Sequence, residues 1–113
     1  MKPLELAKKY MDCVFKTGDY EELRNILADN FQFSGPFYNF DTADAYIDSL
    51  RTDPPVDFDY EIIKSYSDNL SACLIYKFSK PGVSTTMAQM FNITNGKIRS
   101  ILLLFDTDTF RSK

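Results

Sequence analysis

The sequence predicts an α+β domain in which helices pack on one face of a curved, mainly antiparallel sheet. Apolar residues recur at helical spacing between Leu4 and Leu50, and from Val56 onward their period changes to two. Turn signals separate the later strands, the clearest being Asn95-Gly96. Helices that are segregated from a meander of strands in this way favour a layer of helices on an antiparallel sheet.

Three helices are expected before the long strands. The first covers Leu4 to Thr17, because Pro3 suits a first helical turn and Gly18 supplies a stop. The second follows Asp19, which suits an N-cap with an acidic residue, Glu22, three positions later.

The third helix lies in the stretch "FYNFDTADAYIDSL", with Asp41 or Thr42 as its cap. The stretch "RTDPP" ends it, since a residue that precedes proline avoids helical angles. Between the second and third helices, "FQFSGP" alternates as a short strand that Gly35 and Pro36 terminate.

Four longer strands follow the third helix. Turns at "SDN", "SKPG" and Asn95-Gly96 join them, and the last strand is "NGKIRSILLLFD". One face of the second of these strands is apolar by alternation and carries Leu70, Ala72, Leu74, Tyr76 and Phe78.

Length and composition indicate a single globular domain over residues 1–113. The chain is 44% hydrophobic and 26% charged, with a net charge of −3 and the two signs interspersed. Nucleic-acid binding has no electrostatic support without a basic stripe. No stretch is apolar enough for a signal peptide or a membrane span. Cys13 and Cys73 form no CxxC pair, and a reduced cytoplasmic protein is expected.

The absence of histidine excludes several chemistries. Ser-His-Asp and Cys-His nucleophilic machinery and His-ligated zinc all need that residue, so acid-base work must fall to Asp, Glu, Tyr, Lys or Cys. One interpretation of an acidic cluster is a cation site, but alternation favours a solvated strand face instead. No metal or cofactor is therefore expected. The cluster comprises Asp53, Asp57, Asp59 and Glu61.

The order of elements resembles the nuclear transport factor 2-like (NTF2-like) superfamily, which has a cystatin-like, cone-shaped fold. Four stretches carry the resemblance: "YMDCVFKTGDYEELRNILADNFQF", "GPF", "DTADAYIDSL" and the closing "NGKI...LLFD". The ending is most similar to the SnoaL-like polyketide cyclases. The resemblance implies three N-terminal helices packed on a strongly curved sheet, and a homodimer formed through the sheet face. A sheet bent in this way cannot close flush on one helix, so an apolar hollow for a small molecule is expected.

Asp106 is the candidate catalytic residue. The resemblance implies that an aspartate on the last strand acts as a general base, and desolvation would raise the pKa of such a carboxyl. The alternative is a solvated residue at the strand end, or a cap that uses Thr107. The cyclases carry a Gln shortly afterwards, whereas Arg111 stands in that region here.

The candidate ligand-binding residues are a buried amide and several aromatic or apolar side chains. Gln89 shares a face with Met87 and Phe91 by alternation, so its amide needs a partner, which is either a ligand or a neighbouring backbone or Tyr hydroxyl. Tyrosines line a cavity or pack in a core, and Phe37 sits at the expected rim. The full set is Gln89, Tyr10, Met11, Tyr46, Tyr76 and Phe37.

Two other activities of the superfamily are not expected. Alignment with the ketosteroid isomerases puts Gly35 at the base, Met11 at the helical Tyr and Gln89 at the acid of the oxyanion site, so none of these groups is kept. Arg99 has no evident pair of carboxylates, as an epoxide hydrolase of this superfamily would require.

These observations lead to one functional prediction and one alternative. The first is an apolar pocket for a small carbonyl-bearing, polyketide-like or steroid-like molecule, with Asp106 as base and Gln89 and a Tyr hydroxyl orienting the substrate. The alternative is a carrier or a dimeric protein-interaction module without chemistry.

Overall fold

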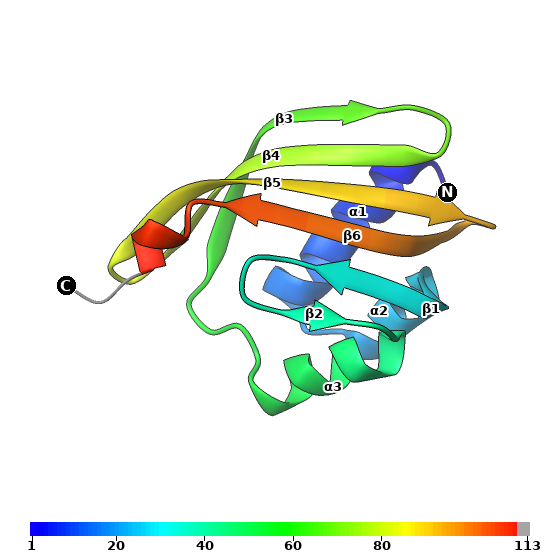
Figure 1. Ribbon diagram of the computed structural model, residues 1–113, viewed down its shortest axis with the longest axis horizontal. Coiled ribbons are helices and arrows are strands. Elements are labelled where there is room, and N and C mark those ends of the chain that lie inside the picture. Colours follow the sequence, from blue (N-terminus) through cyan, green and yellow to red (C-terminus); the bar gives the residue numbers. More distant parts are fainter. Residues whose placement is uncertain (111–113) are drawn as a thin grey trace.

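The computed structural model describes residues 1–110, so Arg111 lies outside the described residues. Helices and strands follow in the predicted order, and the helical segments cluster before the four long strands (Figure 1). The elements are α1 Pro3–Asp12, the π-helical turn η1 Cys13–Thr17, α2 Tyr20–Ile26, β1 Leu27–Ser34, β2 Asn39–Phe40, α3 Ala43–Thr52, β3 Asp59–Ser67, β4 Ser71–Lys80, β5 Val83–Thr94, β6 Lys97–Phe105 and the 3-10 turn η2 Thr107–Phe110.

The six strands form one sheet in the order β2-β1-β6-β5-β4-β3. All neighbouring pairs are antiparallel except β1 and β6, which run parallel. The last long strand therefore lies inside the sheet, between the first strand and the hairpins. Asn95, at a φ of 52°, and Gly96, at 76°, make the tight turn that was predicted before β6.

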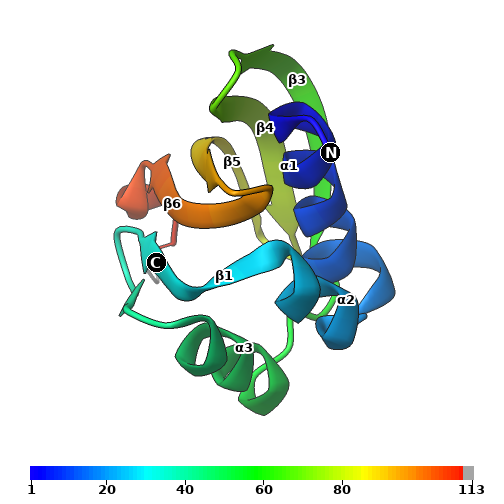
Figure 2. The same cartoon turned by 90° about the vertical axis from the view of Figure 1, so that its right-hand side faces the viewer.

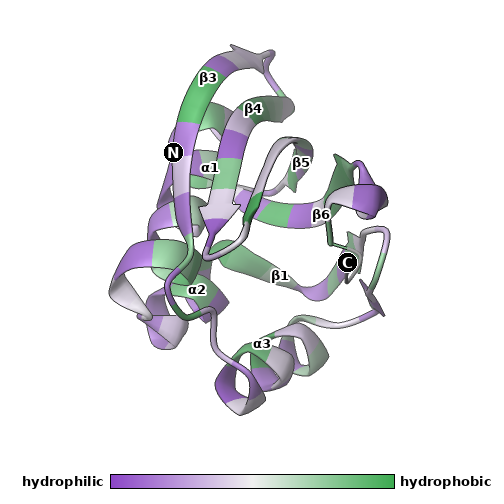
Figure 3. Ribbon diagram, turned by 90° about the vertical axis from the view of Figure 1, so that its left-hand side faces the viewer, coloured by the Kyte–Doolittle hydropathy of each residue, from purple (hydrophilic) through white to green (hydrophobic). Residues whose placement is uncertain are grey.

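The sheet curves strongly, and the helices lie on its concave side (Figure 2). Helix α1 crosses the inner side of the hairpins, while α2 and α3 cover the part built around β1 (Figures 1 and 2). Along β3 and β4 hydrophilic and hydrophobic residues alternate (Figure 3), so that one face of each strand turns inward. The predicted α+β class, with helices on one face of the sheet, is confirmed.

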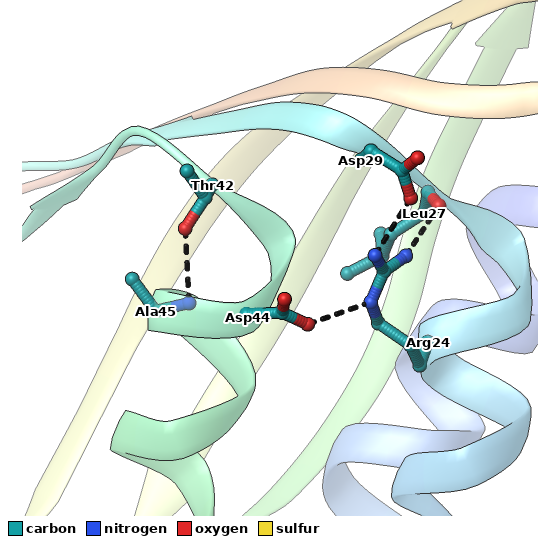
Figure 4. Close-up of polar contacts among 6 residues, drawn as sticks. All are labelled: Arg24, Leu27, Asp29, Thr42, Asp44 and Ala45. Atoms are coloured by element: carbon teal, nitrogen blue, oxygen red, sulfur yellow. Dashed lines mark hydrogen bonds and ion pairs between the residues drawn. The ribbon is translucent and has the colours of Figure 1, made fainter.

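Local capping explains where the helices begin. The Asp19 carboxylate accepts the backbone N–H of Glu22 at 3.1 Å, as the sequence predicts for the start of α2. Of the two candidates for α3, Thr42 is the cap, and its hydroxyl accepts the backbone N–H of Ala45 at 3.1 Å (Figure 4).

The first helix ends differently from an ordinary α-helix. Its last turn, Cys13–Thr17, widens into a π-helix before Gly18 stops it in the left-handed region, at a φ of 65°. The wider turn lets the consecutive residues Val14 and Phe15 both contribute to the cavity described below.

Arg24 ties three elements together near the start of α3. Its guanidinium donates to Asp29 of β1 at 2.7 Å and to Asp44 of α3 at 2.9 Å, and to the backbone carbonyl of Leu27 at 3.3 Å (Figure 4). Planar guanidinium groups suit several acceptors at once. The contacts fix α3 against α2 and β1, and α3 supplies one wall of the cavity.

No helix in residues 1–110 is long and apolar enough to cross a membrane. The first strand is longer than expected, because "LADN" belongs to β1 and follows α2 without a loop. The strand β2 and the turn η2 were not predicted.

Candidate functional site

The concave face encloses a cavity of about 830 Å³ at the end of the sheet where β6 stops. Its walls come from α1, the π-helical turn, α3, the β1–β2 loop, the proline-rich segment after α3 and the inner faces of β4, β5 and β6. Many of the lining side chains are aromatic, namely Tyr10, Phe15, Phe33, Phe37, Tyr38, Phe40, Tyr46, Phe58, Tyr76, Phe78, Phe105 and Phe110. A volume of this size fits an ordinary small organic ligand.

The shape of the rings explains why side chains leave this space. Tyr46 stacks on Phe33 with centroids 5.0 Å apart, and Phe58 meets Phe78 edge to face at 5.1 Å. These geometries are favourable for aromatic pairs, but flat rings cannot bend into a neighbouring gap as an aliphatic chain can. The rings therefore act as walls around the hollow.

Four buried polar side chains meet in the cavity wall, and we call Tyr10, Tyr46, Tyr76 and Gln89 the polar floor. The Tyr76 hydroxyl donates to Gln89 Oε1 at 2.7 Å, and the hydroxyls of Tyr10 and Tyr46 hydrogen-bond each other. Gln89 is only 2% exposed, so its partner is the neighbouring Tyr hydroxyl, one of the alternatives that the sequence left open.

The polar floor is electrically neutral. Burial raises the pKa of Tyr10 well above its ordinary value, and burial likewise raises the pKa values of Tyr46 and Tyr76. Each hydroxyl therefore keeps its proton at neutral pH. Among residues 1–110 no charged side chain is buried. The cavity thus combines apolar walls with a neutral set of hydrogen-bonding groups.

The charged residues that line the cavity within residues 1–110 stand at its rim. Asp48 and Asp53 are exposed at the end of α3, and Lys80 lies on the opposite wall at the end of β4. The Lys80 ammonium lies 5.3 Å from the centre of the Phe110 ring and 5.5 Å from that of Phe58. The cation is therefore held against aromatic rings at the mouth.

Asp106 is exposed and does not line the cavity. Its carboxylate accepts the backbone N–H of Asp108 at 3.0 Å, and its backbone carbonyl accepts the hydroxyl of Thr109 at 2.8 Å. Asp106 thus caps η2, which corresponds to the structural alternative considered for this residue. The geometry gives it no reach to a molecule in the cavity.

The remaining candidates divide into lining and non-lining residues. Gln89, Tyr10, Tyr46 and Tyr76 meet in the polar floor, and Phe37 lies at the rim with 51% of its surface exposed. Met11 is fully buried and does not line the cavity, because it is turned about 100° from Tyr10 around the helix. No group of three or more potential metal ligands is present in residues 1–110.

Sequence reasoning missed several lining residues. Phe78 and Phe105 alternate onto the inner face, and that periodicity was sufficient to find them. Phe110 and the Pro54-Pro55 segment had no such signal, since both lie outside regular strands and helices.

The outer face of the sheet carries a second feature, an apolar stripe across β4, β5 and β6. Cross-strand pairing aligns Cys73 with Met90 and Met90 with Leu102. The next outward row aligns Ile75 with Ala88 and Ala88 with Leu104. Met90 is 40% exposed and Leu104 55%, so within residues 1–110 nothing covers this outer stripe.

No family model matches the chain, and no curated protein matches it in sequence. Solved structures do match. An NTF2-like protein of unknown function from Cytophaga hutchinsonii has a TM-score of 0.83 and 20% identity, covering 97% of this chain and 95% of that one. A candidate SnoaL-like polyketide cyclase from Shewanella putrefaciens has a TM-score of 0.80 and 20% identity, covering 96% and 82%. An LEH-like epoxide hydrolase from M. tuberculosis has a TM-score of 0.79 and 14% identity, covering 93% of this chain and 83% of that one.

These likenesses concern the fold. The matched proteins are described in different terms, and a shared fold does not select among activities. The matches nevertheless extend over 93–97% of this chain. The fold of the matched structures is therefore shared over nearly its whole length. The chain has the NTF2-like fold that its sequence predicts.

Proposed function

We propose that the protein binds a small, neutral, mostly apolar molecule in the cavity and holds it without chemical change. The observation that carries this proposal is the polar floor, a neutral hydrogen-bonding cluster inside aromatic walls. Apolar pockets with a few convergent polar groups are the usual form of a small-molecule site.

The polar floor has more donors than it uses internally. Three hydroxyls and one amide provide five N–H or O–H groups, whereas the two hydrogen bonds described above employ two of them. The surplus favours a ligand that presents an acceptor oxygen, such as a carbonyl. An anionic ligand would have to leave water with no buried cation to receive it, which is strongly unfavourable.

A carrier is favoured over an enzyme because, within residues 1–110, no candidate base lies at the polar floor. Asp106, the candidate base, is exposed and occupied as a cap. The carboxylates that do line the cavity, Asp48 and Asp53, stand at its solvent-exposed rim, away from the buried floor. A general base must lie within hydrogen-bond reach of the proton that it removes.

Binding can be tested before the natural ligand is known. Native mass spectrometry of freshly purified protein should reveal a co-purified small molecule, and the neutral dye N-phenyl-1-naphthylamine should bind with increased fluorescence. Tyr76→Phe keeps the ring but removes the donor to Gln89, and should alter affinity for carbonyl-bearing molecules more than affinity for the dye. Absence of dye binding and of any co-purified molecule would contradict the proposal.

We also propose that the outer stripe pairs two copies of the chain as a homodimer. Met90, Leu102 and Leu104 form an apolar surface on the outer face of the sheet, beside the polar pair Asn92 and Ser100, a pattern typical of an interaction site. Leu102→Lys should yield a monomer in size-exclusion chromatography with light scattering. Thr94→Lys, an exposed change on the same sheet, is the matched control and should remain dimeric. A monomeric wild-type protein would rule out the dimer.

A further inference from the structure

The turn that follows β6 stands at the mouth of the cavity. Phe110, in η2, lines the cavity together with Phe37 and Phe105. The centre of its ring lies 5.0 Å from that of Phe105, 5.8 Å from that of Phe37 and 6.0 Å from that of Phe78. A short turn thus places one aromatic side chain among rings from three other segments.

Backbone hydrogen bonds do not hold this turn to the sheet. The ladder between β5 and β6 ends with the pair Met87 and Phe105. Beyond this pair, in the described part of the chain, the backbone hydrogen bond of the turn joins two of its own residues. The Thr109 N–H donates to the Asp106 carbonyl at 3.3 Å. The contacts that fasten η2 to the body within residues 1–110, as described above, are those of side chains. Segments held in this way open at low free-energy cost compared with strands inside a ladder.

Two residues stabilise the closed position. Asp106 caps the turn through its carboxylate and its carbonyl, which fixes the direction in which Phe110 leaves the strand. Lys80 places its ammonium 5.3 Å from the Phe110 ring centre and so supports the ring from the hairpin side. The first contact is local to the turn, and the second joins the turn to β4.

We propose that residues 106–110 form a lid on the cavity, in which Asp106 is a positioning residue that keeps Phe110 across the mouth, and that opening of this lid sets the rate of ligand exchange. This inference rests on the proposed binding function of the cavity. It gives Asp106 a role that needs an acceptor oxygen and no proton transfer. Asparagine at position 106 should therefore preserve this role, whereas alanine should abolish it.

The kinetic test compares Asp106→Ala with Asp106→Asn in the full chain. N-phenyl-1-naphthylamine is mixed with each protein in a stopped-flow instrument, and association and dissociation rates are measured separately. Loss of a cap shifts the balance between closed and open turns by about fivefold, so both rates of Asp106→Ala should rise by about that factor with a smaller change in Kd. Asp106→Asn keeps the acceptor and should stay within about twofold of wild type.

Phe110→Ala supplies the second part of the test. It removes the lid ring itself, so the rates of Asp106→Ala/Phe110→Ala should equal those of Phe110→Ala alone. Equal rates for wild type and Asp106→Ala would overturn the proposal. Equal acceleration by Asp106→Ala and Asp106→Asn would also overturn it, because charge and not the cap would then be responsible.

A measurement without any ligand separates failure of the lid from failure of the binding function. Met87 is buried and lines the cavity, so Met87→Cys places a thiol behind Phe110; Cys73 on the outer face is replaced by serine in the same protein. The rate of modification by iodoacetamide then reports access to the cavity. We expect Asp106→Ala to raise this rate and Asp106→Asn to leave it unchanged, even if no dye binds. An unchanged rate in Asp106→Ala would refute the lid.

Discussion

The two ends of the concave interior are built from the same strands but filled by different side chains. Along β5, Met87 and Gln89 face the cavity, while Phe91 and Ile93 are packed in the core. β6 runs antiparallel to β5. Its early residue Ile98 is therefore fully buried in the core, and its last residue, Phe105, lines the cavity. We call the packed region around Phe91, Ile93 and Ile98 the closed end, and the region around Met87, Gln89 and Phe105 the open end.

The difference between the ends lies in side-chain shape. Leu23, Leu27 and Ile98 are wholly buried at the closed end, and branched aliphatic chains of this kind interdigitate at high density. At the open end, Tyr46 packs on Phe33 and Phe78 packs on Phe110, and these rigid rings leave a hollow. Backbone curvature therefore permits a cavity, and rigid rings border the part of the interior that stays open.

The largest expected effect comes from the same substitution made at each end. Leu27→Ala, at the closed end, should lower the free energy of unfolding by about 2–5 kcal/mol, because it opens a void in dense packing. Leu103→Ala, at the open end, borders existing space and should cost roughly 1 kcal/mol. Urea denaturation of both variants measures the contrast, and equal losses would show that the two ends are packed alike.

Alkaline pH should act on the open end. The folded-state pKa values of Tyr10, Tyr46 and Tyr76 are raised by burial, so the unfolded chain releases these protons first as pH rises above about 10. Stability is then complete below pH 10 and falls above it, by roughly 4 kcal/mol at pH 11 for the three groups together. Denaturation at pH 8 and pH 11 tests this. Tyr76→Phe should remove about a third of the loss, and an undiminished loss in that variant would exclude Tyr76 as a source.

An intermediate effect is expected from the polar floor. Gln89→Leu leaves the Tyr76 hydroxyl without its acceptor, which should lower the free energy of unfolding by about 1–3 kcal/mol. Adding Tyr76→Phe removes the unsatisfied hydroxyl and should recover part of this loss. A double-mutant cycle by urea denaturation gives the coupling, and strict additivity would mean that the 2.7 Å contact contributes nothing.

The smallest effect belongs to the rim. Lys80→Gln removes the cation that lies against Phe58 and Phe110 and should change stability by only about 0.5 kcal/mol. Dye dissociation should nevertheless become measurably faster, since Lys80 supports the lid. Lys77→Gln, an exposed change on the same strand, is the control and should alter neither quantity. Identical kinetics in both variants would limit Lys80 to a surface role.

Local patterns in the sequence were sufficient for most of the fold. Asp19 and Thr42 are caps, and Asn95-Gly96 is a hairpin turn, because each signal acts over only a few residues. The parallel pairing of Leu27 with Ile98 has no local signal, as the partners are far apart in sequence. The polar stretch "LADN" gave no strand pattern, since only Leu27 among its residues is buried.

The candidate site was predicted unevenly for similar reasons. Alternation along the strands points Gln89 and Tyr76 inward, and the structure places both in the polar floor. Asp106 was chosen by resemblance. By alternation it shares the outward face of Leu104, and it lies past the last paired residue of β6. Its local role as a cap was the part that the residues themselves indicated.

The position of β6 inside the sheet has a consequence for how the chain folds. In the sheet, β1 and β2 touch the hairpins β3 to β5 only through β6, so the two halves cannot be joined until residues 97–105 dock between them. Pairing β6 with β1 closes a loop that contains every element between these two strands. Closing so long a loop is slow compared with forming a hairpin. Newly made chains should thus keep both halves unassembled until residues 97–105 have been made, and β6 is the strand that joins them.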